Sequence, residues 1–316
     1  MMEKPYYQMS YPLQFLLMVL LAVAGLFLGG LICGVIVVIL YGPSGFSAMM
    51  NMSANMPAST LNSLKIMQMG SSVFGFLLPA IFFAKIVVRQ PEPYLKTSHK
   101  FPLMLLLMVF LIMLVSTPLM EMLINLNQKM VFPQSLKGLE RWMRNMEDTA
   151  SQQTEILLKM KTKSSFVVNL LMIAILPAVS EEFIFRGCFQ QIFTGWSKSI
   201  HWGIWISAAL FSAIHFEFYG FLPRMLLGVF FGYFAAWSRS IWPAVLGHFL
   251  NNGTALVMSY LFQLKVLKTN PDDQQFFDWK SVAFSLLLTL ILFLAYKKIS
   301  QTSKSDTNSL NGIRLD

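Results

Sequence analysis

The stretch that decides the fold lies near the start of the chain, where residues 13–41 read LQFLLMVLLAVAGLFLGGLICGVIVVILY. This run carries no Asp, Glu, Lys or Arg, and none occurs between Pro5 and Leu64. About 20 helical residues, rising about 1.5 Å each, cross the roughly 30 Å hydrocarbon layer of a bilayer. The run is too long for the core of a signal peptide, so we expect a retained transmembrane helix with some tilt.

Seven further apolar runs follow the first one. They cover residues 66–88, 101–126, 166–193, 201–216, 221–237, 241–262 and 282–296. Backbone groups in lipid must pair internally, and the ten-residue alternation of transmembrane strands is absent from the sequence. We therefore expect an all-α, polytopic membrane protein with about eight transmembrane helices.

The composition supports a membrane protein over a soluble one. Of 316 residues, 55% are hydrophobic and only 12% are charged, about half the charged share of a typical soluble domain. The net charge is +9, and with so few charges we interpret it as positive-inside anchoring. The lipid bilayer is thus the expected partner, and nucleic acid is not. The two cysteines, Cys33 and Cys188, exclude a disulfide framework.

We divide the chain into three regions. Residues 1–165 form an N-terminal three-helix membrane region that ends in a charged loop at 127–165. Residues 166–262 hold the polar motifs, and residues 263–316 add a last helix and a polar tail, disordered after Lys298. In the charged loop, Glu140 and Arg144 have the i,i+4 spacing of a surface helix. We expect that helix to be solvated or interfacial, with a substrate gate as the alternative.

The positive residues of the short loops predict the orientation. They fall on one side of the membrane if both termini are cytoplasmic. The residues are Lys85, Arg89, Lys96, Lys100, Arg186, Lys198, Arg239, Lys297, Lys298, Lys304 and Arg314. We expect a multi-pass protein of a bacterial inner membrane with this orientation.

Ionisable residues inside membrane helices are functional candidates by default. Residues 177–186 read PAVSEEFIFR. Because four helical residues advance by about 40°, Arg186 lies over Glu182 and away from Glu181. We expect an ion pair between Glu182 and Arg186, which leaves Glu181 free to act as a general base. The alternative is a purely structural Glu–Arg lock.

Two histidines lie on later spans. His215 ends the sequence FSAIH, and His248 opens HFLNN, which places Asn252 on nearly the same helix face as His248. An imidazole and an amide presented together can ligate a metal or donate to an oxyanion. The alternative for each is a hydrogen bond between helices. No Gly-x-Ser-x-Gly motif supports a serine nucleophile.

Taken in order, three motifs resemble the CPBP family, the type II CAAX prenyl endopeptidases and their bacterial bacteriocin-processing and immunity relatives. The motifs are Glu-Glu-x-x-x-Arg from Glu181 to Arg186, Phe-x-x-x-His from Phe211 to His215, and His-x-x-x-Asn from His248 to Asn252. They lie within residues 168–257. The resemblance implies an eight-helix intramembrane bundle.

The resemblance also implies a role for each motif residue. Glu181 would activate a water for attack on a peptide carbonyl, and His215 would position that water or bind a metal. His248 and Asn252 would stabilise the oxyanion or complete a metal site, with Glu182 and Arg186 as structural support. Glu181, His215 and His248 would be the zinc ligands if zinc is bound; both metal-dependent and metal-free mechanisms are proposed for the family.

We therefore expect an intramembrane endopeptidase that acts on a peptide or protein substrate with a membrane-associated segment. Two other classes stay open. One is a transporter, because buried Glu, His and Arg also mark ion pathways, although no inverted repeat is visible. The other is a non-catalytic immunity or scaffold protein that keeps the motifs for their structural bonds.

Overall fold

The structure, a computed structural model, describes residues 9–47, 56–160, 162–270 and 277–310. Within these ranges the chain is helical and forms no strand, so the all-α prediction is confirmed. Each of the eight predicted spans is helical, because a helix pairs all its backbone groups within one segment. The principal α-helices are α1 (Tyr11–Ser47), α2 (Ala58–Gly70), α5 (Met104–Val115), α6 (Thr117–Gln128), α7 (Lys137–Leu157), α8 (Lys163–Asn169), α9 (Leu176–Ile184), α10 (Gln190–Ser197), α11 (Ile200–Ala213), α12 (Phe221–Ser238), α13 (Trp242–Gln263) and α14 (Trp279–Leu310).

Two of the spans are built from several consecutive segments. The second joins α2 to the π-helix η2 (Ser71–Leu77), α3 (Leu78–Phe82) and the π-helix η3 (Phe83–Val88). The span that carries the glutamates joins α8, the π-helix η5 (Leu170–Ile175), α9, the π-helix η6 (Phe185–Phe189) and α10. Wide turns of this kind occur often at functional sites.

The predicted count of about eight membrane spans is not confirmed. Within the described ranges, five helices are long and apolar enough to cross a membrane, or six if the bent pair α5 and α6 is one span. Helix α11 has 14 residues, about 21 Å, which is short of the hydrocarbon thickness. Helix α13 has 22 residues but is not among the five. Its polar residues, His248, Asn251 and Asn252, lower its hydropathy.

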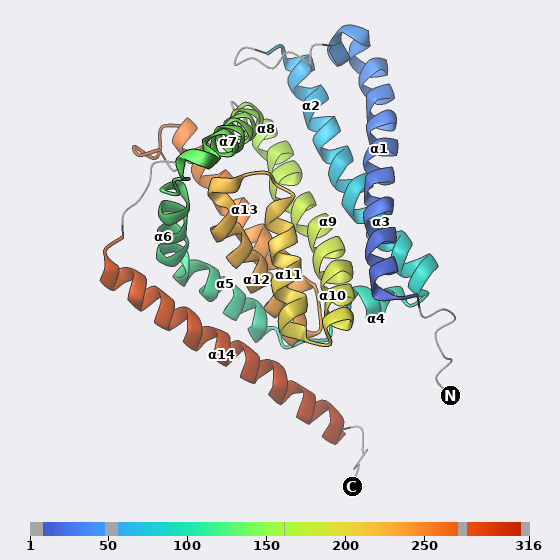
Figure 1. Ribbon diagram of the computed structural model, residues 1–316, viewed down its shortest axis with the longest axis vertical. Helices are drawn as coiled ribbons and strands as arrows, with labels where there is room; N and C mark the ends of the chain where they lie inside the picture. The colour runs from blue at the N-terminus through green and yellow to red at the C-terminus, as the bar shows by residue number, and fades with distance from the viewer. Residues whose placement is uncertain (1–8, 48–55, 161, 271–276, 311–316) are drawn as a thin grey trace.

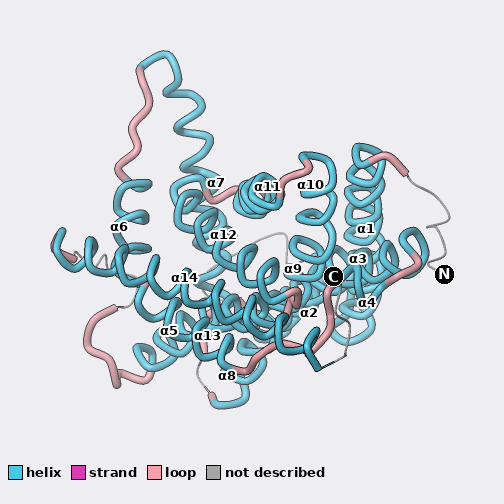
Figure 2. The backbone as a smooth tube through the Cα atoms, turned by 90° about the horizontal axis from the view of Figure 1, so that it is seen from below, coloured by secondary structure: helices cyan, strands magenta, loops and turns pink. Residues whose placement is uncertain are grey.

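The motif-bearing helices form the middle of the molecule (Figures 1 and 2). Helices α9 to α13 pack on one another, with α1 and α2 on one side and α5 and α14 on the other (Figure 1). Two apolar clusters hold these layers. One joins α1 and α3 to the glutamate-bearing span around Phe185, and the other joins α5, α12 and α14 around Phe234. The polar site therefore lies between two packed layers.

Helix α7 is the charged helix expected in the 127–165 loop. The predicted Glu140–Arg144 pair is present at 3.5 Å, and Lys137 lies 2.7 Å from the same carboxylate. Another bond joins α7 to the 3-10 turn η7 (Phe218–Gly220), since the Tyr219 backbone N–H donates to Glu147 at 2.7 Å. Helix α7 is thus attached to the connection that directly follows His215.

The polar tail after Lys298, expected to be disordered, begins as a continuation of α14. Helix α14 continues to Leu310, and the last six residues, 311–316, lie outside the described ranges. Once an apolar span has formed a helix, each added residue gains a backbone hydrogen bond without a new nucleation cost. The helix therefore extends into polar sequence.

Candidate active site

Glu182 and Arg186 form the buried ion pair that the helical spacing predicts. Arg186 Nη1 donates to Glu182 Oε1 at 2.9 Å, and the side chains are 1% and 0% exposed. Arg186 Nη2 donates to the Gly228 carbonyl on α12, also at 2.9 Å. The guanidinium lies over the rings of Phe211 and Phe231, 4.9 and 5.4 Å from their centroids. A charge pair with these extra bonds is tolerable in a low-dielectric interior.

The approach of α12 to Arg186 depends on a glycine. A Cβ added at Gly228 would lie 3.0 Å from the Ala208 side chain and 3.4 Å from Arg186 Nη2. Any larger residue would push α12 away from the guanidinium. Gly228 therefore allows the backbone carbonyl to act as the second acceptor for Arg186.

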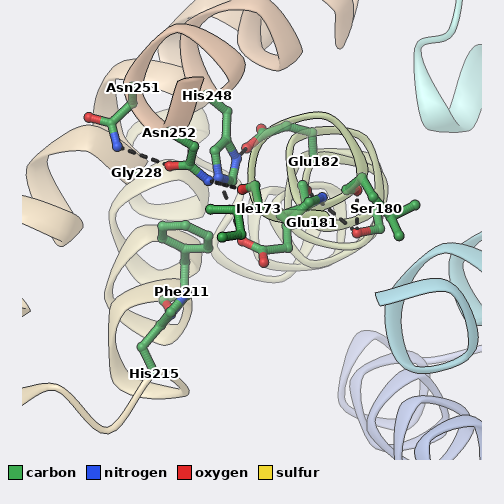
Figure 3. Close-up of polar contacts among 12 residues, drawn as sticks. Ile173, Ser180, Glu181, Glu182, Phe211, His215, Gly228, His248, Asn251 and Asn252 are labelled. Atoms are coloured by element: carbon green, nitrogen blue, oxygen red, sulfur yellow. Dashed lines mark hydrogen bonds and ion pairs between the residues drawn. The ribbon is translucent and has the colours of Figure 1, made fainter. Parts of the chain in front are cut away.

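His248 contacts both glutamates, as Figure 3 shows. Its Nδ1 lies 2.9 Å from Glu182 Oε1, and its Nε2 lies 3.8 Å from Glu181 Oε2. The imidazole stacks on Phe231 with a centroid distance of 5.2 Å and an interplanar angle of 13°. Because an ionised carboxylate only accepts, Nδ1 carries the proton toward Glu182. In the neutral ring, Nε2 then presents a lone pair to the region of Glu181.

Glu181 differs from Glu182 in its surroundings. Its side chain is 13% exposed, whereas Glu182 is fully buried. The 3.8 Å to His248 is too long for a direct hydrogen bond. Glu181 is therefore the more accessible carboxylate, and it has no side-chain hydrogen bond among the described residues.

Asn252 is used to hold helices together. Its Nδ2 donates to the Ile173 carbonyl in η5 at 3.1 Å, and its Oδ1 accepts from Asn251 Nδ2 at 3.1 Å (Figure 3). The amide therefore ties α13 to the wide turn that precedes the two glutamates. Asn252 lies near His248 on the same helix, as predicted. Its hydrogen bonds, however, indicate a structural role in holding two helices together.

His215 lies apart from the glutamate cluster. Its Nδ1 is 2.7 Å from the Phe211 carbonyl, one turn back on α11. The Phe211 ring contacts both imidazoles, with centroids 5.0 Å from His215 and 5.9 Å from His248 (Figure 3). Within the described part of the chain, no hydrogen bond or ion pair joins His215 to Glu181 or His248. The structure thus brings Glu181, Glu182, Arg186 and His248 together, and places His215 at the edge.

The expected zinc ligands do not fit one metal ion in this arrangement. Among the described residues, no three His, Cys, Asp or Glu side chains are grouped so that a metal could bind them. His215 is the ligand that does not join the others: its Nδ1 is bonded to the Phe211 carbonyl, and its ring contacts the Phe211 ring. We therefore derive no chemical step through a metal.

Arg224 is the residue that the sequence reasoning missed. It lies on the first turn of α12, and its guanidinium forms an ion pair with Glu217. The available signal was a charged residue within the predicted 221–237 span. Arg224 is close to the first residue of that span. A cation at such a position is easily interpreted as one whose side chain extends to the membrane–water interface.

Apolar helices around a buried Glu–His–Arg cluster define an integral membrane protein with a polar site inside its helices. Residues 163–254 match the family model described as Type II CAAX prenyl endopeptidase Rce1-like. This match confirms the resemblance carried by the three motifs and supports an intramembrane protease. No curated protein and no solved structure matches the chain.

Proposed function

We propose that this protein is an intramembrane endopeptidase in which Glu181 activates a water for hydrolysis of a peptide bond. One observation carries the proposal: the accessible Glu181 carboxylate faces Nε2 of His248, whose other nitrogen is fixed by Glu182. A general base must be oriented and close to the proton that it abstracts. The Glu182–Arg186 pair supplies that orientation from inside the bundle.

The proposed reaction adds water across one C–N bond. Glu181 takes a proton from the water, and the oxygen attacks the carbonyl carbon to give a tetrahedral intermediate. The C–N bond then breaks, and Glu181 returns the proton to the leaving nitrogen. His248 donates from Nδ1 to Glu182, and its Nε2 accepts a hydrogen bond from the same water.

We assign the remaining motif residues to positioning of the water, the substrate or the glutamate-bearing span. His215 positions the water or the substrate from the edge of the cluster. His248 and Asn252 were expected to bind the oxyanion as a pair. Because both already hold other groups, we assign Asn252 to positioning of the glutamate-bearing span.

The proposed substrate is a peptide or protein with a membrane-associated segment, since the site lies within apolar helices. We place the protein in a bacterial inner membrane. The distribution of positive residues supports an orientation with both termini in the cytoplasm. Nucleic acid has no part in the proposed activity.

The test is an assay of the purified protein in detergent with membrane-associated peptides, including prenylated and leader-type sequences. Wild-type protein is compared with Glu181→Gln. Cleavage by wild type only supports the proposal, and equal cleavage by both contradicts the role of Glu181. If wild type cleaves none of the peptides, gradient-driven uptake into proteoliposomes would favour a transporter, and its absence would favour a non-catalytic scaffold.

A further inference from the structure

Arg224 lies where the connection after His215 enters α12. Its Nη2 donates to the Glu217 carboxylate, which fixes one side of the guanidinium. Gly220 lies directly beside it, since a Cβ there would be 3.6 Å from Nη2 and 3.7 Å from Nη1. The side chain is 21% exposed. Arg224 is therefore held in one orientation by a short loop and an acidic partner.

The other end of the guanidinium has no partner. Arg224 Nη1 is buried and makes no hydrogen bond within the described part of the chain. A buried donor left unpaired costs about 1–3 kcal/mol, and more when it is charged. Such a group in a native structure calls for an explanation, and a catalytic role is one such explanation.

Arg224 is also near the proposed catalytic groups. Its ion-pair partner Glu217 is two residues after His215 in the chain. Its interaction with Glu147 and its bond to Glu217 lie on the side of the loop and α7. The guanidinium is thus anchored by the acidic loop that directly follows His215.

The proposed chemistry requires charged or polar donors directed at the substrate carbonyl, and a cationic donor is the strongest kind. A tetrahedral intermediate needs hydrogen-bond donors aimed at its negative oxygen. In His248 the Nδ1 proton is committed to Glu182, and one N–H of the Asn252 amide donates to the Ile173 carbonyl. The charged Nη1–H of Arg224, unpaired among the described residues and beside the loop after His215, meets this need.

We propose that Arg224 is a catalytic residue whose Nη1–H donates to the carbonyl oxygen of the scissile peptide bond as that oxygen becomes negative. The inference rests on the proposed endopeptidase function and extends it, because Arg224 lies outside the three motifs. Arg224 donates a hydrogen bond and stays protonated throughout, so the proton transfers of the proposed reaction are unchanged.

The experiment measures kcat and KM on a cleaved peptide for wild type, Arg224→Gln and Arg224→Lys. Loss of one oxyanion donor lowers kcat by about 100- to 1,000-fold, and we expect that fall for Arg224→Gln with KM within about threefold. Arg224→Lys keeps the charge without the planar fork, so we expect an intermediate loss. The matched control is Arg144→Gln, which removes the arginine that stacks on Tyr219 at 4.2 Å. We expect that control to keep kcat within about twofold.

A second measurement separates catalysis from folding. A phosphinate peptide carries the negative tetrahedral group of the intermediate, whereas a ketomethylene peptide keeps the uncharged carbonyl. We expect Arg224→Gln to bind the phosphinate about 100-fold more weakly than wild type, and the ketomethylene peptide almost as well. Equal weakening of both, or unchanged kcat in both Arg224 variants, overturns the assignment of Arg224. Absence of cleavage by wild type overturns the proposed function itself.

Discussion

The carboxylate of Glu182 and the imidazole of His248 lie 2.9 Å apart, although 66 residues separate them in the chain. This contact joins the first and third motifs and fixes the tautomer of His248. The same Glu182 oxygen accepts from Arg186. One buried oxygen therefore connects the ion pair that stabilises the bundle to the imidazole that faces Glu181.

Replacement of Glu181 by Gln should remove turnover while preserving the fold. The amide keeps the shape of the side chain but cannot take a proton, and a general base contributes about 100- to 10,000-fold in rate. Cleavage rate and melting temperature in detergent check both parts. The control is Glu155→Gln on the exposed face of α7, which should change neither. A Glu181→Gln protein that retains full turnover would show that another group activates the water.

Removal of Arg186 should instead reduce stability. Arg186→Ala leaves the Glu182 charge buried without its cation, and such a change costs about 3–5 kcal/mol. We expect lower yield of folded protein and a lower melting temperature. A double variant, Glu182→Gln with Arg186→Met, removes both charges and should regain part of the loss. Normal yield and melting temperature for Arg186→Ala alone would refute the pairing.

The separation of His215 from Glu181 and His248 predicts activity that needs no bound metal. After dialysis against a chelator, we expect unchanged cleavage by protein that holds less than about a tenth of an equivalent of metal per chain. Elemental analysis and activity are measured on the same sample. Loss of cleavage that zinc restores would assign Glu181, His215 and His248 to a metal site that forms by rearrangement.

Lys96 should make stability depend on pH. Burial, and then the charge of Arg239, lower the pKa of Lys96 from 10.5 to about 8. Between these values the unfolded chain binds more protons than the folded one, so stability rises with pH from about 8 toward 10.5. Below pH 8 the penalty is fully present.

The measurement is the melting temperature from pH 7 to pH 10 in wild type and Lys96→Met. We expect the variant to be more stable at pH 7, by up to about 3 kcal/mol, since one pKa unit corresponds to about 1.4 kcal/mol. The rise with pH should be absent from the variant. The same slope in both proteins would mean that another group titrates.

The contacts within single helices were predictable from the sequence. Long runs without charge predict the spans, and the i,i+4 rule predicts both the Glu182–Arg186 and the Glu140–Arg144 pairs. The number of spans was harder, because a 14-residue apolar helix such as α11 has the same composition as one that is long enough to cross the membrane. Helix length separates the two, and composition alone does not.

The contacts between helices could not be predicted in the same way. Helical spacing places His248 and Asn252 on one face, but it cannot show that one reaches Glu182 and the other the Ile173 carbonyl. Those partners depend on the rotation and height of α13 against its neighbour. The position of His215 behind the Phe211 ring depends in the same way on the rotation of α11.

The π-helices η5 and η6 stand on either side of α9, which carries the two glutamates. A wide turn holds one residue more than an α-turn, so it shifts the angular phase of everything after it by about 100°. Deleting one residue from 170–175 would turn Glu181 and Glu182 away from His248 while leaving each motif intact. A one-residue gap between Asn169 and Glu181, in an alignment of this chain with a relative, would therefore mark a protein whose carboxylates face elsewhere.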